Sequence, residues 1–148
     1  MSFSPFFLNQ NSRGSSRATV ANFQNGSGST LAQAVPVSVN TSSQIVPLDV
    51  TSETSVQALV GLTSIAIPNA ATGSVVDNGR LENITTTFAI GDAVYAGKDT
   101  PLTNVKPDLT VGDWASGDFV IFIGVVVQNE FNPSQKDIKL MISLIGQL

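Results

Sequence analysis

Phe119-Val-Ile-Phe-Ile-Gly-Val-Val-Val127 is the stretch of sequence that decides the fold class. It is apolar at successive positions, so a strand built from it would have two apolar faces. Such a strand needs cover on both sides, and it therefore lies in the centre of a sheet or is covered by another subunit. A membrane helix needs about 20 apolar residues, and this stretch is much shorter than that.

The segment that follows alternates in the way expected of a strand with one buried face. Residues 129–135 are predicted to join it to 119–127 as an antiparallel hairpin. One face of the final strand is predicted to carry Ile138, Leu140, Ile142 and Leu144, and the other Lys139, Met141, Ser143, Ile145 and Gln147.

Upstream of 119–127 the apolar segments are short and are separated by turn residues. Val37-Ser-Val-Asn40 and Ile45-Val-Pro-Leu48 are predicted to be strands, and Pro47 indicates an edge. In 73–84, Asn78-Gly79 suits a type I′ turn, which predicts a hairpin there.

Helix signals are confined to 51–61 in this part of the chain. A hydroxyl cap before Glu53 and a terminating Gly61 favour one or two turns. The sequence therefore predicts an all-β protein, a compact β-barrel or sandwich with at most one short helix.

The front of the chain differs from the rest. Residues 1–35 are rich in Ser, Asn, Gln, Gly and Pro, and they are predicted to be an extended N-terminal arm, with residues 36–148 as the β-rich domain. Disordered segments are poor in aromatic residues, yet four of the eight phenylalanines lie within the first 23 positions.

Residues 3–8, which we call the aromatic segment, contain Phe3, Phe6, Phe7 and Leu8. Ordering these six residues costs about 6–12 kcal/mol of backbone entropy. Burying the four apolar side chains returns about the same amount. The arm is therefore expected to order where a groove receives its rings, either on a neighbouring subunit or on the chain's own core. The predicted partner-binding residues are Phe3, Phe6, Phe7, Leu8, Arg13, Arg17 and Phe23.

Composition excludes several kinds of chemistry. The chain has 148 residues and contains no cysteine and no histidine, which removes disulfides, cysteine nucleophiles, Cys/His zinc sites and a histidine base. Residues 1–48 carry two basic and no acidic residues (+2), whereas residues 49–148 carry five basic and eleven acidic residues (−6), and together these give the net charge of −4. That balance makes nucleic acid an unexpected partner.

The acidic residues are the remaining candidates for a site. The five acidic residues that lie closest together in the sequence do not have the spacing of a calcium-binding loop. Several of them follow glycine, so they are predicted to brace turns and not to bind a cation. Serines have no base nearby in sequence, and a phosphate-binding loop is absent. We expect no enzymatic activity, metal or cofactor. The five acidic residues considered for a site are Asp92, Asp99, Asp108, Asp113 and Asp118.

Two aromatic residues in the body allow two interpretations each. Trp114 follows Asp113 in a polar loop, where it is either an exposed contact residue or a ring that closes the end of a barrel. Tyr95 is expected in the core with its hydroxyl near the surface. Carbohydrate binding stays open as an alternative, although aromatic and acidic residues are not clustered.

Several motifs together resemble capsid decoration (cement) proteins and related small structural proteins of tailed bacteriophages. They are Gly91-Asp-Ala-Val-Tyr95, Pro101-Leu-Thr103, Gly117-Asp-Phe-Val-Ile-Phe-Ile-Gly-Val-Val-Val127 and the amphipathic final strand. The likeness covers roughly residues 61–148. It implies a β-rich body that oligomerises, often as a trimer, on the outer surface of the shell, with an arm that reaches its neighbours.

The resemblance thus leads to the expectation of a virion protein, made in the host cytoplasm, whose partners are the major capsid protein and itself. No nucleic acid or membrane partner is expected. A tail-fibre, baseplate or collar attachment module is the second hypothesis, although the chain has no shaft repeat. A carbohydrate-binding domain is the third.

Overall fold

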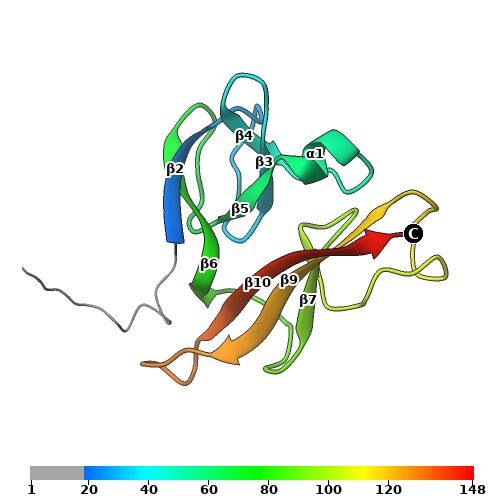
Figure 1. The fold of residues 1–148 in the computed structure, drawn as a ribbon. Coiled ribbons are helices and arrows are strands. Elements are labelled where there is room, and N and C mark those ends of the chain that lie inside the picture. Colours follow the sequence, from blue (N-terminus) through cyan, green and yellow to red (C-terminus); the bar gives the residue numbers. More distant parts are fainter. Residues whose placement is uncertain (1–18) are drawn as a thin grey trace, which may run out of the picture.

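The computed structural model describes residues 19–148, and over this range the protein is all-β with one short helix. The predicted fold class, a compact β-barrel or sandwich with at most one short helix, is confirmed for this part of the chain, and of the two architectures the protein has a closed barrel. Figure 1 shows two bodies of strands, a barrel and a second sheet, with β6 running from one to the other.

Five strands form the barrel, in the order β2-β4-β3-β5-β6, and pairing between β2 and β6 closes it. β2 runs parallel to β4, and the other pairs are antiparallel. The segments predicted around Val37 and Ile45 are confirmed as strands. The strand bounds are β2 Thr19–Asn25, β3 Pro36–Val39, β4 Gln44–Pro47, β5 Leu59–Thr63 and β6 Thr72–Ile84.

The predicted hairpin at Asn78-Gly79 is wrong, because β6 continues through both residues as one strand of 13 residues. Gly79 does have a positive φ of 83°, but the chain uses it within the strand. The residues before it pair with β2 and β5, and Gly79 and those after it pair with β10. Asn78-Gly79 therefore marks the point where β6 passes from the barrel to the second sheet.

The second sheet continues from β6 in the order β10-β9-β7-β8. β9, which contains the doubly apolar stretch, lies between β10 and β7, so its predicted central position is confirmed. The predicted antiparallel hairpin between the last two strands is also confirmed. The strand bounds are β7 Ala93–Ala96, β8 Leu102–Thr103, β9 Phe119–Gln128 and β10 Lys136–Gln147.

Two apolar cores hold these strands together. The barrel core consists of Leu31, Val35, Val37, Ile45, Ile67 and Val75. The larger core takes residues from β5 and β6 as well as from β7, β9 and β10, so it joins the barrel to the second sheet. Its most buried members include Leu62, Val94, Ile123, Val126 and Ile138.

The single turn of helix, α1 Glu53–Gln57, begins as predicted. The Ser52 side chain caps it by accepting a hydrogen bond from the backbone N–H of Ser55 at 3.2 Å. The predicted end is wrong, however, since Gly61 lies inside β5 instead of ending the helix. A side chain at Gly61 would collide with the backbone oxygen of Val76, so glycine is needed for β5 to approach β6.

The boundary between arm and body lies earlier than residue 35. β2 forms six residue pairs with β6, and Leu31 and Val35 are buried in the barrel core. Asn25 is 1% exposed, and its amide donates to the backbone oxygens of Ser29 and Ile67 at 2.8 Å each. Residues 19–35 are therefore part of the body, because a polar segment can be held by backbone pairing and buried amides as well as by apolar periodicity.

Candidate interaction surface

Within residues 19–148, the second half of β10 has a strand partner on one side only. β10 pairs with β9 along its whole length, but its pairing with β6 ends at Leu140. No other strand within residues 19–148 pairs with residues 141–147. An unpaired strand edge presents backbone groups that a further segment can meet.

Three large apolar side chains are exposed on this half of β10. Met141 is 46% exposed, Leu144 57% and Ile145 53%. Together we call these three residues the β10 surface. Two register shifts, after Leu140 and after Leu144, interrupt the alternation, so the neighbouring residues 144 and 145 are both exposed.

A groove separates this half of β10 from the barrel. One hollow of about 450 Å³ lies between β10 and the barrel strands β2, β5 and β6. Its lining is mostly apolar: Ala21, Phe23, Leu59, Val60, Gly61, Asp77 and Ile142. A second hollow of about 400 Å³ continues it and is lined by Thr19, Asp77, Asn78, Leu140, Met141 and Ile142. The described chain therefore begins, at Thr19, at the side of this groove.

Most of the predicted partner-binding residues lie outside the described residues: Phe3, Phe6, Phe7, Leu8, Arg13 and Arg17. Phe23 is described, and it is half-buried against the barrel core while also lining the groove. A partner in the groove would therefore meet only part of its ring.

The β10 surface is what the sequence analysis missed. Strict alternation places Leu144 on the same face as the buried Ile138 and Leu140, yet Leu144 is exposed. The register shifts in β10 cause this difference, and they are set by its pairing with β9 and not by the alternation of residues within β10. The only signal in the sequence is the apolar pair Leu144-Ile145, which breaks the alternation.

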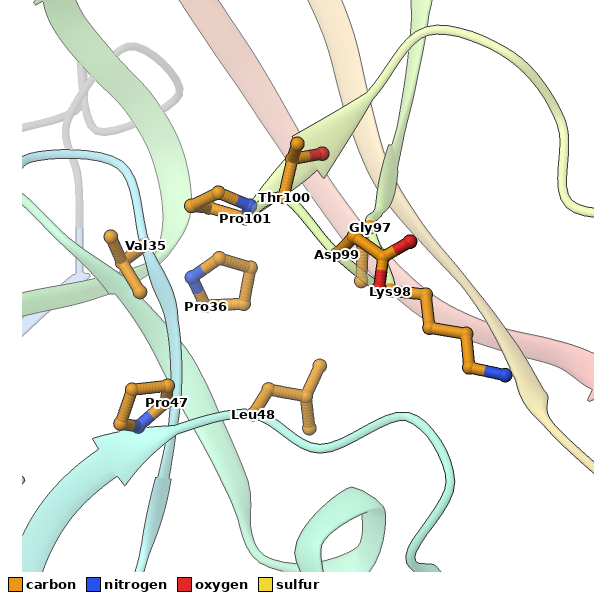
Figure 2. Close-up of a pocket in the computed structure, with 10 residues that line it drawn as sticks. Val35, Pro36, Pro47, Leu48, Gly97, Lys98, Asp99, Thr100 and Pro101 are labelled. Carbon is orange, nitrogen blue, oxygen red and sulfur yellow. The ribbon is translucent and has the colours of Figure 1, made fainter. Parts of the chain in front are cut away.

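A smaller pocket of about 200 Å³ lies between the barrel and the turn that joins β7 to β8. Figure 2 shows Val35, Pro36 and Leu48 on the barrel side and Pro101 on the other, with the Lys98 side chain leading away from them. The pocket therefore offers mainly apolar contacts.

The Lys98 ammonium is already engaged beside this pocket. It donates to the Asp118 carboxylate and to the backbone oxygen of Asp113, both at 2.7 Å. This hydrogen bond from Lys98 holds the pKa of Asp118 below its usual value and raises the pKa of Lys98. Hydrogen bonding with the Asp113 side chain raises the pKa of Asp99. Lys98, Asp99, Asp113 and Asp118 therefore interact with one another beside the pocket.

The turn-bracing role predicted for aspartates is confirmed at three positions. Asp92 accepts from the backbone N–H of Ala89, Asp108 from that of Thr110, and Asp118 from that of Ala115. The bond from Asn104 to Asp92, and those from Thr110 to Asp108, lower the pKa of each carboxyl.

The two aromatic residues of the body are packed against neighbours. Trp114 is half-buried and packs against the larger core, so it covers that core and does not close the end of the barrel. Tyr95 is half-buried and meets Phe122 edge to face, with ring centroids 5.6 Å apart.

Within residues 19–148, no group of three acidic residues is placed to hold a metal ion. In the same part of the chain, no helix has the length and apolar character needed to cross a bilayer. Comparisons of the chain with family models, with curated proteins and with solved structures find no match.

Proposed function

We propose that the protein is a non-enzymatic structural protein of a phage virion, which binds the outer surface of the capsid and stabilises it. The observation that carries this proposal is the β10 surface, where large apolar side chains lie exposed beside a strand edge that no described residue pairs with. Contiguous exposed apolar side chains are typical of surfaces that another protein covers. The choice of a capsid among possible assemblies rests on the resemblance of residues 61–148 to decoration proteins.

The proposed partners are the major capsid protein and further copies of this chain in a trimer. A protein that binds the assembled shell better than its free subunits stabilises the shell by mass action. Because the same contact is repeated over many sites, each one can be weak. The absence of enzymatic activity is proposed because the buried and half-buried carboxylates are occupied by turns and ion pairs, as at Asp118 and Asp137.

The experiment mixes the purified full chain with empty shells assembled from the major capsid protein of the same source, and sediments the shells. We expect saturable binding at a fixed ratio of copies per shell, and a higher melting temperature of the decorated shells. Unassembled capsid protein is the control, and it should bind much less.

A chain that stays in the supernatant at every concentration would contradict the proposal. Binding of the isolated protein to a glycan array, without binding to shells, would favour the carbohydrate-binding hypothesis instead.

A further inference from the structure

We propose that the aromatic segment of one copy, residues 3–8, packs on the β10 surface of a second copy. The half of β10 beyond Leu140 is then the receiving surface within a homo-oligomer. This inference rests on the proposed function in one respect, namely that the protein works as part of an assembly, and it names the partner surface within that assembly.

The chemistry of the receiving surface suits aromatic side chains. Met141, Leu144 and Ile145 are flexible or branched apolar side chains, each about half exposed. Methionine makes favourable contacts with aromatic rings as well as apolar ones. The aromatic segment supplies three rings and one leucine within six residues, and it contains no charged residue. Both sides therefore gain from leaving water.

The register shifts in β10 decide the form of the contact. A regular free edge would accept a long added strand, but bulges interrupt the regular spacing of backbone groups. The β10 surface therefore offers mainly contacts between side chains, together with a short run of backbone pairing.

The length of chain before Thr19 favours contact of the aromatic segment with a second copy over contact with its own copy. Thr19 and Met141 line the same hollow, so the segment outside the described residues starts beside the β10 surface. Residues 9–18 have a polar composition, and fully extended they span about 33 Å at 3.3 Å per residue. Residues 141–147 of β10 span about 23 Å.

A segment that ran directly along its own β10 would therefore place polar residues against the apolar β10 surface. The aromatic segment would pass beyond the end of the strand. When it reaches a second copy, rings meet apolar side chains and the polar stretch bridges the two molecules.

Charge supports the same pairing. Arg13 and Arg17 are the charged side chains of residues 1–48, whereas residues 49–148 carry a net charge of −6. Asp77 is exposed and lines both hollows of the groove beside Met141. With the aromatic segment on Leu144 and Ile145, Arg13 lies within reach of Asp77 of the receiving copy, since only five residues separate it from Phe7.

Each copy both provides one aromatic segment and receives one. A contact of this head-to-tail kind closes when the copies form a ring, and every β10 surface is then covered. The trimer proposed above satisfies this condition.

The test uses the full chain, with a photoreactive phenylalanine analogue in place of Phe6. Copies labelled with ¹⁴N and ¹⁵N are mixed, irradiated and digested with trypsin. We expect a cross-link between the peptide 1–13 and the peptide 140–148. When the two labels are mixed in equal amounts and the copies have exchanged, mixed-isotope pairs should be twice as frequent as pairs of either single isotope. Pairs of one isotope only would show that the segment binds its own copy, and a cross-link that maps to other peptides would place it elsewhere. Either result overturns the proposal.

Light scattering provides the second measurement, on full-length variants. Leu144→Lys with Ile145→Lys, and separately Phe6→Ser with Phe7→Ser, should reduce the mass to that of the monomer, 15.5 kDa, at concentrations where the unmodified chain is an oligomer. Leu109→Lys is the matched control, because Leu109 is also 57% exposed but lies in the loop before β9, and it should leave the oligomer intact.

An unmodified chain that is monomeric at all accessible concentrations, or variants that remain oligomers, would overturn the proposal. Its failure is distinguishable from failure of the proposed function. A cross-linked oligomer that does not bind shells removes the capsid assignment alone, and shell binding by a chain without the cross-link removes the contact between copies alone.

Discussion

Asp137 is a buried carboxylate surrounded by hydrogen-bond donors. It is fully buried, and it accepts from Arg80 Nη1 and from the backbone N–H of Asn83, both at 3.0 Å. The Asn129 amide donates to both of its carboxylate oxygens at 3.0 and 3.3 Å. Asn129 in turn accepts from the backbone N–H groups of the loop before β10. One carboxylate thus ties together β6, β10 and that loop.

Asp137→Asn is expected to destabilise the protein by about 3–5 kcal/mol, because the largely buried Arg80 side chain would lose its buried charged partner. Denaturant unfolding at neutral pH measures this change. Glu130→Gln is the control, since Glu130 is 41% exposed and lies 3.9 Å from Arg80, where an ion pair contributes about 0–1 kcal/mol. Equal effects of the two substitutions would refute this account of the pair.

Asp118 gives the protein an acid-dependent contribution to stability. Its folded-state pKa is lowered by the hydrogen bond from Lys98, so the contribution is present above the unfolded-state value of about 3.9 and is lost as pH falls through the folded-state pKa. Asp118→Asn should therefore lower the melting temperature at pH 7, and the difference from the unmodified protein should shrink below pH 4.

The control for this pH series is Glu82→Gln, an exposed carboxylate outside the ion pairs of residues 19–148. It should have little effect at either pH. If Asp118→Asn costs as much at pH 2.5 as at pH 7, the stabilisation does not come from the charged carboxylate.

At the scale of elements, β6 determines how the two sheets are joined. Its first half closes the barrel and its second half starts the other sheet, with Gly79 at the crossing. Pairing between β5 and β6 consists of only two residue pairs, at Leu62 and Thr63. The glycine beside them, Gly61, therefore affects this pairing directly.

Gly61→Ala should destabilise the protein more than Gly91→Ala, by about 1–3 kcal/mol, which is typical of overpacking. Both glycines have a positive φ, 145° and 95°, so both substitutions incur backbone strain. Only the alanine at 61 would also collide with the Val76 oxygen, whereas the space at 91 is open. Thermal unfolding of the two variants compares them, and equal losses would mean that the β5–β6 approach relaxes without cost.

Strand prediction from the sequence succeeded where the local pattern is strong. The doubly apolar stretch of β9, the alternation at Ile138 and Leu140, and the final hairpin are all present in the structure. It failed where two sheets compete for one strand. Asn78-Gly79 has the composition of a turn, but β2 and β10 supply partners on either side of it, and pairing energy then outweighs local turn preference.

For the whole molecule, the boundary between arm and body has a direct consequence. At concentrations where the full chain is a monomer, a chain without residues 1–18 should unfold cooperatively at nearly the same temperature as the full chain, because every described pairing remains and no contact between copies contributes. A chain without residues 1–35 should show no such transition, since it lacks β2, the buried Asn25 amide and the apolar residues Leu31 and Val35. Circular dichroism during heating distinguishes the two, and a folded product of the longer deletion would restore the boundary at residue 35.

The sequence alone indicated one of the two sides of the proposed contact, the aromatic segment. Phenylalanines concentrated near the N-terminus predict a segment that needs a partner, because exposed rings in a polar arm are unfavourable. Where the body has an uncovered apolar surface was not predictable, since the exposure of Leu144 depends on the register of β10 against β9.

The sequence by itself determined that this protein is built from strands, that it lacks cysteine and histidine chemistry, and that its charge is divided between front and body. These properties follow from residue types and from spacings of a few positions. Only the tertiary structure decided that β6 belongs to two sheets, that residues 19–35 complete a barrel and that the pairing of β10 with β6 ends at Leu140. The physical reason is that strand pairing joins residues far apart in the chain, so its register is set by the whole fold and not by local preference.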